Sequence, residues 1–480
     1  MGLASLSTLL LLLSLVPSCT SSDRLAPAKP LIFPDRIVSS NGVFAMGIFS
    51  PTNNSSSSRF YIGIWYNNVP ERTVVWVANR DDPIATTPSP STTLAVTNLS
   101  GLVLSDTTSG RIYWSTRNDA AGGASSAVLL NEGNLVLRST NGTVLWQSFD
   151  HPTDTILPGM PFRANYRTRL AGRLVSWKGP EDPATGDFSL SGDFSSGLQY
   201  FIWRGPNLTW RSSPWNGGTM SAYKPSGDSS APVILTTIMA DGDEITLTYT
   251  LSDGSSGLRA RMSYTGEYEF SLLNSDASAW TLLSAYPGPG CSRYASCGSY
   301  GYCDGMELEA IRRTCRCPEG FEPKAKGSGG PWAGCTRKET LRCDAAAADD
   351  QFATLTGVKT PATPVFVRNR TLGGCEAECR GNCSCTVHGL RLRQLDRCPE
   401  RGRLVPGACS GSENSWTWGS TWTLWARTSI SGSPVHHRQV LRLARAVPFS
   451  AATAYYSSHV LYVYKLERKK WIPLNISYIY

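Results

Sequence analysis

Residues 133–148 read GNLVLRSTNGTVLWQS, and residues 100–115 read SGLVLSDTTSGRIYWS. Both stretches contain Leu-Val-Leu followed by a glycine and, four residues later, a tryptophan, at an offset of 32–33 residues. Each copy predicts a strand, a glycine-containing turn and a second strand, with Trp114 or Trp146 directed into a shared core. Because repeated hairpins that close around a common axis leave no exposed edge, the repeat predicts an all-β domain.

The segments around this repeat predict further strands. Phe60 to Trp65 and Thr73 to Val77 are runs of β-branched and aromatic residues bounded by turn residues. Residues 200–203 and 245–250 also predict strands, and the Ser/Gly-rich segment 252–257 predicts a turn. With 44 Gly, 30 Pro and 15 Trp among 480 residues, the composition favours turn-rich β structure, and the length predicts three or four domains.

The 14 cysteines are distributed unevenly, since none lies between Cys19 and Cys291. The first half of the chain must therefore be held together by buried apolar surface. The second half is predicted to consist of small modules stapled by disulfides. Disulfides form in oxidising compartments, so this distribution predicts a protein outside the cytosol.

The N-terminus also predicts secretion. Leu9 to Val16 is almost purely apolar and is followed by small residues, which predicts a signal peptide over residues 1–22. Its apolar core is shorter than the ~20 residues that a bilayer span requires. Eight Asn-x-Ser/Thr sequons are present, and glycans are expected on five of their asparagines: Asn53, Asn98, Asn141, Asn207 and Asn369.

The net charge of +8 comes from the C-terminal part of the chain. Residues 386–480 hold 13 Lys and Arg against 4 Asp and Glu, a balance of +9, so the preceding 385 residues carry −1. The body of the protein is therefore electrically neutral, and no nucleic-acid partner is expected.

Several motifs resemble those of a known family: IGIWY (62–66), TVVWVANR (73–80), GNLVL (133–137), WQSFDHPTDT (146–155), LVSW (174–177), Asp182-Pro183-x-x-Gly186-x-Phe188 and WRSSPWNG (210–217). They resemble the bulb-type lectin module and the segments that follow it in plant S-locus glycoproteins and S-domain (G-type lectin) receptor kinases. The resemblance covers roughly residues 25–385. It implies a β-prism bulb-type lectin domain (23–160), a second lectin-like β domain, the S-locus glycoprotein domain (161–285), an EGF-like domain (287–336) and a PAN/apple domain (343–428).

The resemblance also identifies a candidate sugar-binding strand. Bulb-type lectins contact mannose through a Q-x-D-x-N-x-V-x-Y strand, whose polar side chains share one face because a strand repeats every two residues. In this sequence the pattern falls on Leu130, Glu132, Asn134, Val136 and Arg138. Only Glu132 and Asn134 remain as a candidate sugar face, and the copy at residues 97–105 matches only at Val103. Leu130 stands in place of the Gln and Arg138 in place of the Tyr, and each lost hydrogen-bonding partner removes roughly 1 kcal/mol of binding free energy. We therefore expect a lectin scaffold without mannose affinity.

Disulfide pairings follow from the resemblance. The EGF-like module implies three bridges: Cys291–Cys303, Cys297–Cys315 and Cys317–Cys335. The PAN/apple module implies Cys379–Cys385, with Cys375 reaching a later cysteine, most simply Cys398. Segment 286–290, ahead of the first EGF cysteine, contains no acidic residue, and the EGF window contains no histidine. Neither a calcium nor a zinc site is therefore expected.

After residue 385 the resemblance stops. A family member would continue into an aliphatic strand and a final strand, whereas Arg-rich segments and the tryptophans of residues 416–425 follow here. We therefore expect the PAN/apple domain to be intact only to about residue 386, to lack its last strand, and to be followed by an unrelated basic tail at 429–480. A frame change, a retained intron or an alternative exon explains the break. The alternative is a basic tail that binds cell-wall or membrane anions.

The sequence contains no transmembrane segment, kinase motif or other catalytic motif, so neither an enzyme nor a cofactor is expected. We predict a secreted, apoplastic recognition glycoprotein that resembles the ectodomain of an S-domain receptor kinase and reaches a membrane only through a partner. It would bind a protein or peptide ligand or a partner receptor, as in self-incompatibility, pollen recognition or immune signalling. Two alternatives stay open, a mannose-binding lectin and a nonfunctional truncated receptor product, and so does homodimer formation.

Overall fold

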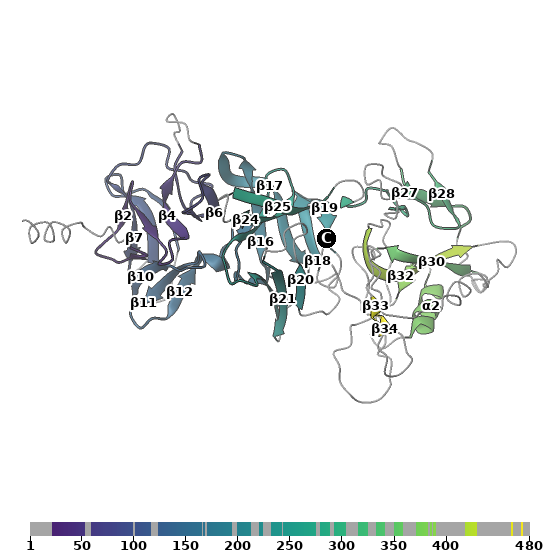
Figure 1. Ribbon diagram of the computed structural model, residues 1–480. Coiled ribbons are helices and arrows are strands. Elements are labelled where there is room, and N and C mark those ends of the chain that lie inside the picture. The colour runs from purple at the N-terminus through teal and green to yellow at the C-terminus, as the bar shows by residue number, and fades with distance from the viewer. Residues whose placement is uncertain are drawn as a thin grey trace, which may run out of the picture. The chain divides into compact units, whose positions relative to one another are not determined.

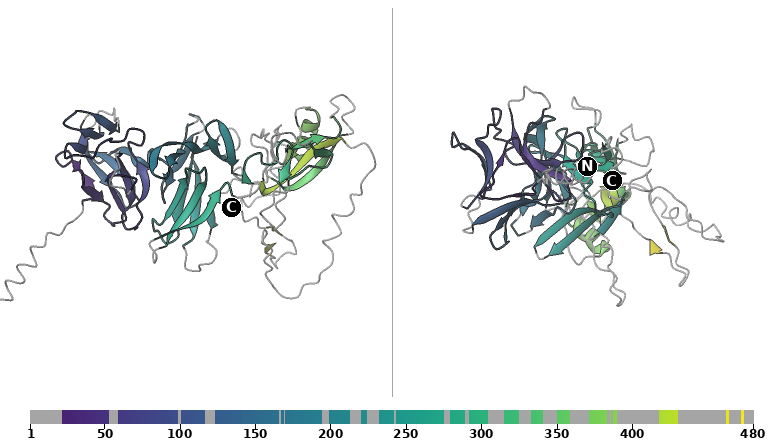
Figure 2. Two further views of the ribbon diagram at one scale, coloured as in Figure 1. Left: turned by 90° about the horizontal axis from the view of Figure 1, so that it is seen from above. Right: turned by 60° about the vertical axis from the view of Figure 1, so that its left-hand side comes forward.

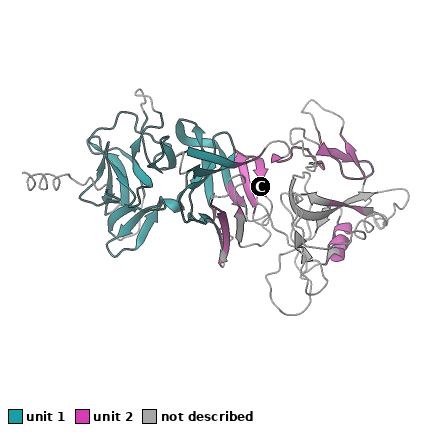
Figure 3. Cartoon of the chain, viewed as in Figure 1, with its two compact units in different colours: residues 1–162, 172–190, 248–283 teal, residues 163–171, 191–247, 284–480 magenta. Residues whose placement is uncertain are grey.

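The computed structural model describes residues 22–52, 59–98, 101–116, 123–165, 167–168, 170–193, 199–212, 220–223, 232–241, 243–274, 279–288, 292–303, 315–324, 333–340, 350–358, 371–382, 385, 387–389, 418–429, 462–463 and 472–473. These residues divide into two compact units (Figure 3). Unit 1 takes those within 1–162, 172–190 and 248–283, and unit 2 takes the rest. Strands predominate in the described residues, which confirms the predicted all-β fold class.

Strands β1 to β12 of unit 1 form three antiparallel sheets of four strands each, which we call the prism (Figures 1 and 2). The first sheet has the order β3 (Arg36–Val38), β4 (Phe44–Phe49), β5 (Tyr61–Tyr66), β6 (Thr73–Val77). The second has the order β2 (Leu31–Ile32), β7 (Thr92–Thr97), β8 (Gly101–Asp106), β9 (Ile112–Ser115). The third has the order β1 (Arg24–Leu25), β10 (Ala124–Leu129), β11 (Leu135–Ser139), β12 (Val144–Gln147), and the short helix η1 (Ser148–Asp150) follows it.

The three sheets repeat one local structure around an aromatic centre. Trp76 of β6, Trp114 of β9 and Trp146 of β12 pack edge to face, with ring centroids 5.8, 5.9 and 5.8 Å apart. In every sheet the ladder to this outer strand shifts register directly after the residue opposite the tryptophan: Ile64, Leu104 and Leu137. The prediction that Trp114 and Trp146 share a core is confirmed. Trp76 completes a third copy that the sequence repeat did not reveal.

The first described residues tie the sheets together. β1 pairs with β10, β2 with β7 and β3 with β4, so residues 24–38 contribute one strand to every sheet. Leu25, Leu31 and Ile37 of these strands are 2%, 5% and 3% exposed. A single segment therefore crosses all three sheets and buries one apolar side chain from each of its strands.

Unit 1 also contains all or most of each of several strands that follow the prism in sequence, which we call the adjoining strands. They are β13 (Thr155–Ile156), β16 (Arg173–Gly179), β17 (Asp182–Asp193), β23 (Leu258–Met262), β24 (Tyr268–Asn274) and β25 (Ala279–Tyr286). β13, β23, β24 and β25 are consecutive in one sheet, and β16 neighbours β17 in another. Two backbone bonds of 2.7 Å, from Val175 N to Thr153 O and from Met262 N to Asp154 O, hold residues 153–154 against β16 and β23.

The remaining elements lie wholly or partly in unit 2. They are β14 (Phe162–Asn165), β15 (Leu170–Ala171), β18 (Gln199–Arg204), β19 (Asn207–Arg211), β20 (Met220–Tyr223), β21 (Ile234–Asp241), β22 (Glu244–Leu251), β26 (Tyr302–Cys303), β27 (Cys315–Arg316), β28 (Phe321–Pro323), β29 (Cys335–Arg337), β30 (Asp350–Val358), α2 (Leu372–Arg380), β31 (Val387–Gly389), β32 (Trp418–Ser429), β33 (Tyr462–Val463) and β34 (Ile472–Pro473). The strands predicted at 200–203 and 245–250 lie within β18 and β22. Two short antiparallel pairs, β26 with β27 and β28 with β29, lie in the segment predicted to be EGF-like.

The structure corrects the prediction for the end of the PAN/apple segment. That prediction expected the last strand to be missing after residue 386, but β32 pairs antiparallel with both β30 and β31. Sequence comparison by motif missed this strand because it lacks the expected aliphatic pattern. Its threonines and tryptophans nevertheless have high β propensity, which suits a pleated sheet surface. The basic tail predicted at 429–480 lies largely outside the described residues.

Candidate functional site

The candidate sugar face of the third sheet begins with Asn134, and its side chain serves the fold. It is 6% exposed. The amide donates to Gln147 Oε1 at 2.9 Å, and its oxygen accepts from Ser148 Oγ and Phe149 N, both at 3.2 Å. Gln147 in turn donates to Asp150 Oδ2 at 2.9 Å. These bonds fasten the turn before β11 to η1, so the contacts of Asn134 favour a structural role over the sugar contact considered from sequence.

The other positions of the sugar pattern on this strand offer few groups for a sugar. Glu132 lies in the turn before β11 and is partly exposed. Leu130 supplies only backbone contacts there, since its N–H donates to Asn134 O and its carbonyl accepts from Gly133 N. Val136 is 2% exposed. Glu132 is therefore the one side chain of the predicted pair that stays available at the surface.

The second sheet carries the second copy of the pattern on β8 and the turn before it. Thr97 Oγ1 donates to Gly101 O at 3.2 Å across this turn, and Val103 is 8% exposed. Gly101 occupies the place that Asn134 has in the third sheet, as the shared register with β9 and β12 shows. A glycine there leaves no side chain to contact a sugar.

The first sheet contains a third copy, which sequence reasoning missed. By register with β6, the places of Asn134, Val136 and Arg138 are taken on β5 by Tyr61, Gly63 and Trp65. A Cβ added to Gly63 would lie 2.6 Å from the Phe49 ring, so this ring covers the strand where the pattern has its valine. None of the three sheets thus presents the full set of sugar-contacting side chains.

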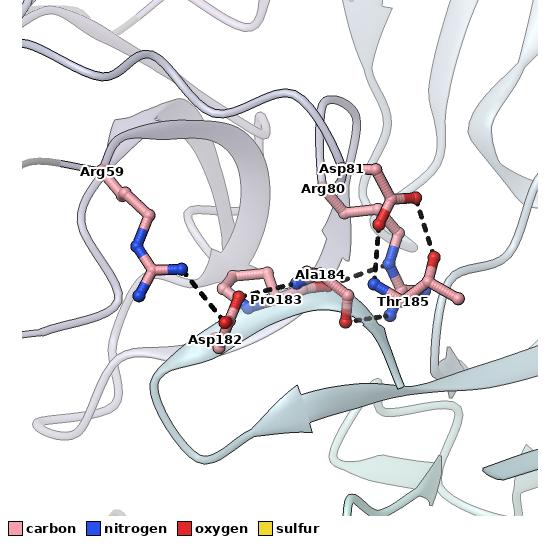
Figure 4. Close-up of polar contacts among 7 residues, drawn as sticks. All are labelled: Arg59, Arg80, Asp81, Asp182, Pro183, Ala184 and Thr185. Carbon is pink, nitrogen blue, oxygen red and sulfur yellow. Dashed lines mark hydrogen bonds and ion pairs between the residues drawn. The ribbon is translucent and has the colours of Figure 1, made fainter. Parts of the chain in front are cut away.

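A second candidate site joins the prism to the adjoining strands through Arg80 (Figure 4). Arg80 follows β6, and its guanidinium donates to four carbonyl oxygens: Val175 at 3.0 Å, Ser176 at 2.6 Å, Pro183 at 2.9 Å and Ala184 at 3.4 Å. Burial lowers the pKa of Arg80, and the nearby carboxylates of Asp154 and Asp81 oppose that shift. Asp154 is itself 4% exposed, and burial raises its pKa against the opposing effect of Arg261 and Arg80.

Two further side chains, those of Asp81 and Arg59, contact residues at the start of β17. Asp81 accepts from both the N–H and the hydroxyl of Thr185, each at 2.7 Å. Arg59 forms an ion pair of 3.0 Å with Asp182. Figure 4 shows these residues around the turn. We call the contacts of Arg59, Arg80 and Asp81 with residues 175–185 the latch.

The close packing of β17 against β16 requires a glycine at position 186. A Cβ at this position would lie 2.1 Å from Trp177 O, a distance too short for any side-chain carbon. The sequence motifs Asn79-Arg80-Asp81, Trp177 and Asp182-Pro183-x-x-Gly186 therefore meet in one place. Their spacing in sequence gave no sign that they do, because 95 to 104 residues separate the partners of Arg80 and Asp81.

Within the described ranges, no group of three or more His, Cys, Asp or Glu side chains could hold a metal ion. No helix in the part of the chain that the structure covers is both long and apolar enough to cross a membrane. His151 stacks on Trp146 at 5.3 Å and accepts a bond from Trp76 Nε1 through its backbone carbonyl.

Three of the disulfides implied by the resemblance are present: Cys297–Cys315, Cys317–Cys335 and Cys379–Cys385. Cys375 is also disulfide-bonded, whereas Cys398, its expected partner, lies outside the described residues. The expected Cys291–Cys303 bridge cannot be placed, since Cys291 lies outside them too.

Three of the expected glycan sites lie on exposed turns or strand ends: Asn98, Asn141 and Asn207. Asn98 is in the β7–β8 turn and Asn141 in the β11–β12 turn. Asn53 and Asn369 lie outside the described residues. Glycans on these asparagines stay a prediction.

Comparison with known families agrees with this architecture. The chain matches the D-mannose binding lectin family over residues 73–178, the S-locus glycoprotein domain over 210–325 and the PAN-like domain over 343–398.

Comparison with individual proteins extends over most of the chain. It is 32% identical to the S-locus-specific glycoprotein S6 of Brassica oleracea over 384 residues, which cover 77% of this chain and 82% of the relative. It is 33% identical to the S-locus-specific glycoprotein BS29-2 of Brassica oleracea var. alboglabra over 363 residues, 73% of this chain and 79% of the relative. It is 34% identical to the receptor-like serine/threonine-protein kinase SD1-7 of Arabidopsis thaliana over 381 residues, 77% of this chain but 42% of that kinase.

Proposed function

The chain belongs to the S-locus glycoprotein family, and from this premise we propose that it is an extracellular recognition glycoprotein whose ligand is a protein or peptide, or a membrane receptor of the same family. Its relatives include S-locus-specific glycoproteins and receptor-like kinases, and the part that they share with this chain is of the receptor-ectodomain type. We propose the apoplast as its location and self-incompatibility, pollen recognition or immune signalling as the process.

One observation carries the choice of a protein ligand over a sugar. The three equivalent strands of the prism hold Asn134, Gly101 and Tyr61 at the place where the mannose pattern has its asparagine. The first is held by three protein hydrogen bonds, the second has no side chain, and the third is 0% exposed. A sugar needs converging polar side chains at an accessible strand, and these positions do not supply them.

The disulfides support an extracellular location. Cys297–Cys315 and Cys317–Cys335 close loops in a small module whose strands are only two or three residues long. Such modules depend on bridges that persist in oxidising compartments. We retain the domain limits 23–160, 161–285, 287–336 and 343–428 as part of this proposal.

A binding experiment tests the proposal. The purified chain is immobilised, and extracellular parts of receptor kinases from the same family are passed over it, before and after enzymatic removal of their N-glycans. We expect at least one receptor to bind, with unchanged affinity after deglycosylation and in excess mannose. Binding that disappears in mannose or after deglycosylation would point to the lectin alternative instead.

A further inference from the structure

The outer face of the first prism sheet is a packed apolar surface. Its buried members are Val38, Ala45, Phe49, Tyr61, Trp65 and Val77. Trp177, an adjoining-strand residue, and Val74 of β6 pack against this cluster. Because β5 is the register equivalent of β11, this is the face on which the third sheet carries the sugar pattern. Here aromatic rings replace sugar-binding groups, and a tryptophan from another part of the chain covers them.

A second contact closes the neighbouring edge of the same sheet. Trp280 of β25 packs on Tyr66 with ring centroids 5.0 Å apart, and its Nε1 donates to Thr73 Oγ1 at 2.9 Å. The Tyr66 hydroxyl donates to Ser256 O at 2.6 Å. The Arg259 guanidinium lies 4.6 Å from the Trp280 ring centroid. Polar and aromatic contacts therefore hold both the face and the edge.

The other two sheets show what this face looks like without a cover. By register, Val74 of the first sheet corresponds to Ile112 of the second and Val144 of the third. Ile112 is 60% exposed and Val144 is 49% exposed, whereas Val74 packs against the covered cluster. Among the residues that the structure describes, the cover thus lies on the first sheet alone, where the surface is aromatic and the latch is present.

We infer that the adjoining strands are the built-in partner of the first sheet's outer face, and that Arg80 is the residue that couples the prism and these strands into one cooperative unit. The occupant is residues 173–188 and 256–280 of this same chain. In this arrangement one of the three lectin faces serves intramolecular recognition and is not available to an external ligand. The division of the chain agrees with this inference, since the prism and these strands fall in the same compact unit.

Arg80 suits the coupling role for a chemical reason. A planar guanidinium presents a fixed fork of donors, and here the fork contacts carbonyls on both sides of the β16–β17 turn. A lysine carries the same charge but cannot reach both sides at once. Replacing Arg80 with lysine therefore removes the bridging geometry and keeps the charge.

Hydrogen exchange of the whole secreted chain tests this inference in three variants. Arg80→Lys removes the fork of donors. Thr185→Val removes only the hydroxyl contact with Asp81, and this milder variant keeps the test possible if Arg80→Lys is poorly secreted. Arg111→Ala is the matched control, because Arg111 is also an arginine paired with an aspartate, Asp82 at 2.7 Å, but it does so on the surface of the prism. Exchange is compared between residues 173–190 and the prism strands β7 and β8.

We expect Arg80→Lys to accelerate exchange in residues 173–190 by about tenfold or more, with β7 and β8 unchanged. We expect thermal unfolding of this unit to be a single transition in the parent chain and to broaden or split in Arg80→Lys. Thr185→Val should shift the same residues by less, and Arg111→Ala should leave them unchanged. Parent-like exchange in both latch variants, or an equal acceleration in β7 and β8, would overturn the coupling role, since the second outcome is general destabilisation.

Discussion

The replacement of Asn134 with alanine separates a structural role from a sugar-binding role. The substitution removes three hydrogen bonds, to Gln147, Ser148 and Phe149, at 2.9, 3.2 and 3.2 Å. At about 1 kcal/mol net for each bond, the free energy of unfolding should fall by about 3 kcal/mol. The loss of stability is larger if the Phe149 N–H stays buried without a partner, because such a group costs about 1–3 kcal/mol.

Urea denaturation followed by tryptophan fluorescence measures this effect, since Trp146 lies one residue from Gln147 and reports on the prism core. Glu132→Ala is the control, because Glu132 is partly exposed in the same turn and should change stability by less than about 0.5 kcal/mol. A loss below about 1 kcal/mol for Asn134→Ala would refute the structural role derived from these bonds.

Three further predictions concern the rest of the fold. Trp114→Ala should cost about 3–5 kcal/mol in thermal or urea unfolding, because it opens the tryptophan triangle at the prism centre; a loss under about 1 kcal/mol would contradict that role. Gly186→Ala should abolish or sharply reduce secretion because its Cβ would meet Trp177 O at 2.1 Å, whereas Gly179→Ala, with 4.0 Å to the nearest atom, should be secreted normally; equal yields of the two would rule out the clash. Reduction should leave the circular dichroism of the cysteine-free residues 25–285 intact while the disulfide modules unfold. A bridge such as Cys297–Cys315, whose cysteines are 18 residues apart, contributes on the order of 3 kcal/mol to the stability of its module. Loss of prism structure on reduction would count against this division.

Much of the prism could be predicted from the sequence because its signals are local. The strand Thr73–Val77 was predicted with the observed bounds, since a β-branched run between turn residues is self-sufficient evidence. Trp114 and Trp146 were placed in one core because each follows a glycine turn at the same distance. Trp76 was missed as the third member because β6 follows a turn without that glycine, so only the register of the strands reveals the equivalence.

The candidate sites were less predictable, because they depend on residues far apart in the chain. The sequence motifs around Arg80 and Gly186 were recognisable one by one, but nothing local indicates that a guanidinium will meet carbonyls about 100 residues later. The resemblance to the bulb-type lectin pattern, together with strand alternation, predicts that Asn134 lies on a sugar face. Alternation gives the direction of a side chain. It does not show that Ser148 and Phe149 of a following helix donate hydrogen bonds to the amide oxygen of Asn134.

Calorimetric titration of the intact chain with mannose shows whether the three prism sheets have lost their sugar-binding positions. We expect no measurable heat of binding up to millimolar sugar, because Gly101 and the buried Tyr61 stand where a mannose site has an accessible asparagine, and Asn134 is itself buried and hydrogen-bonded to the protein. Micromolar mannose binding that disappears in Asn134→Ala, with the fold of that variant intact, would contradict this expectation.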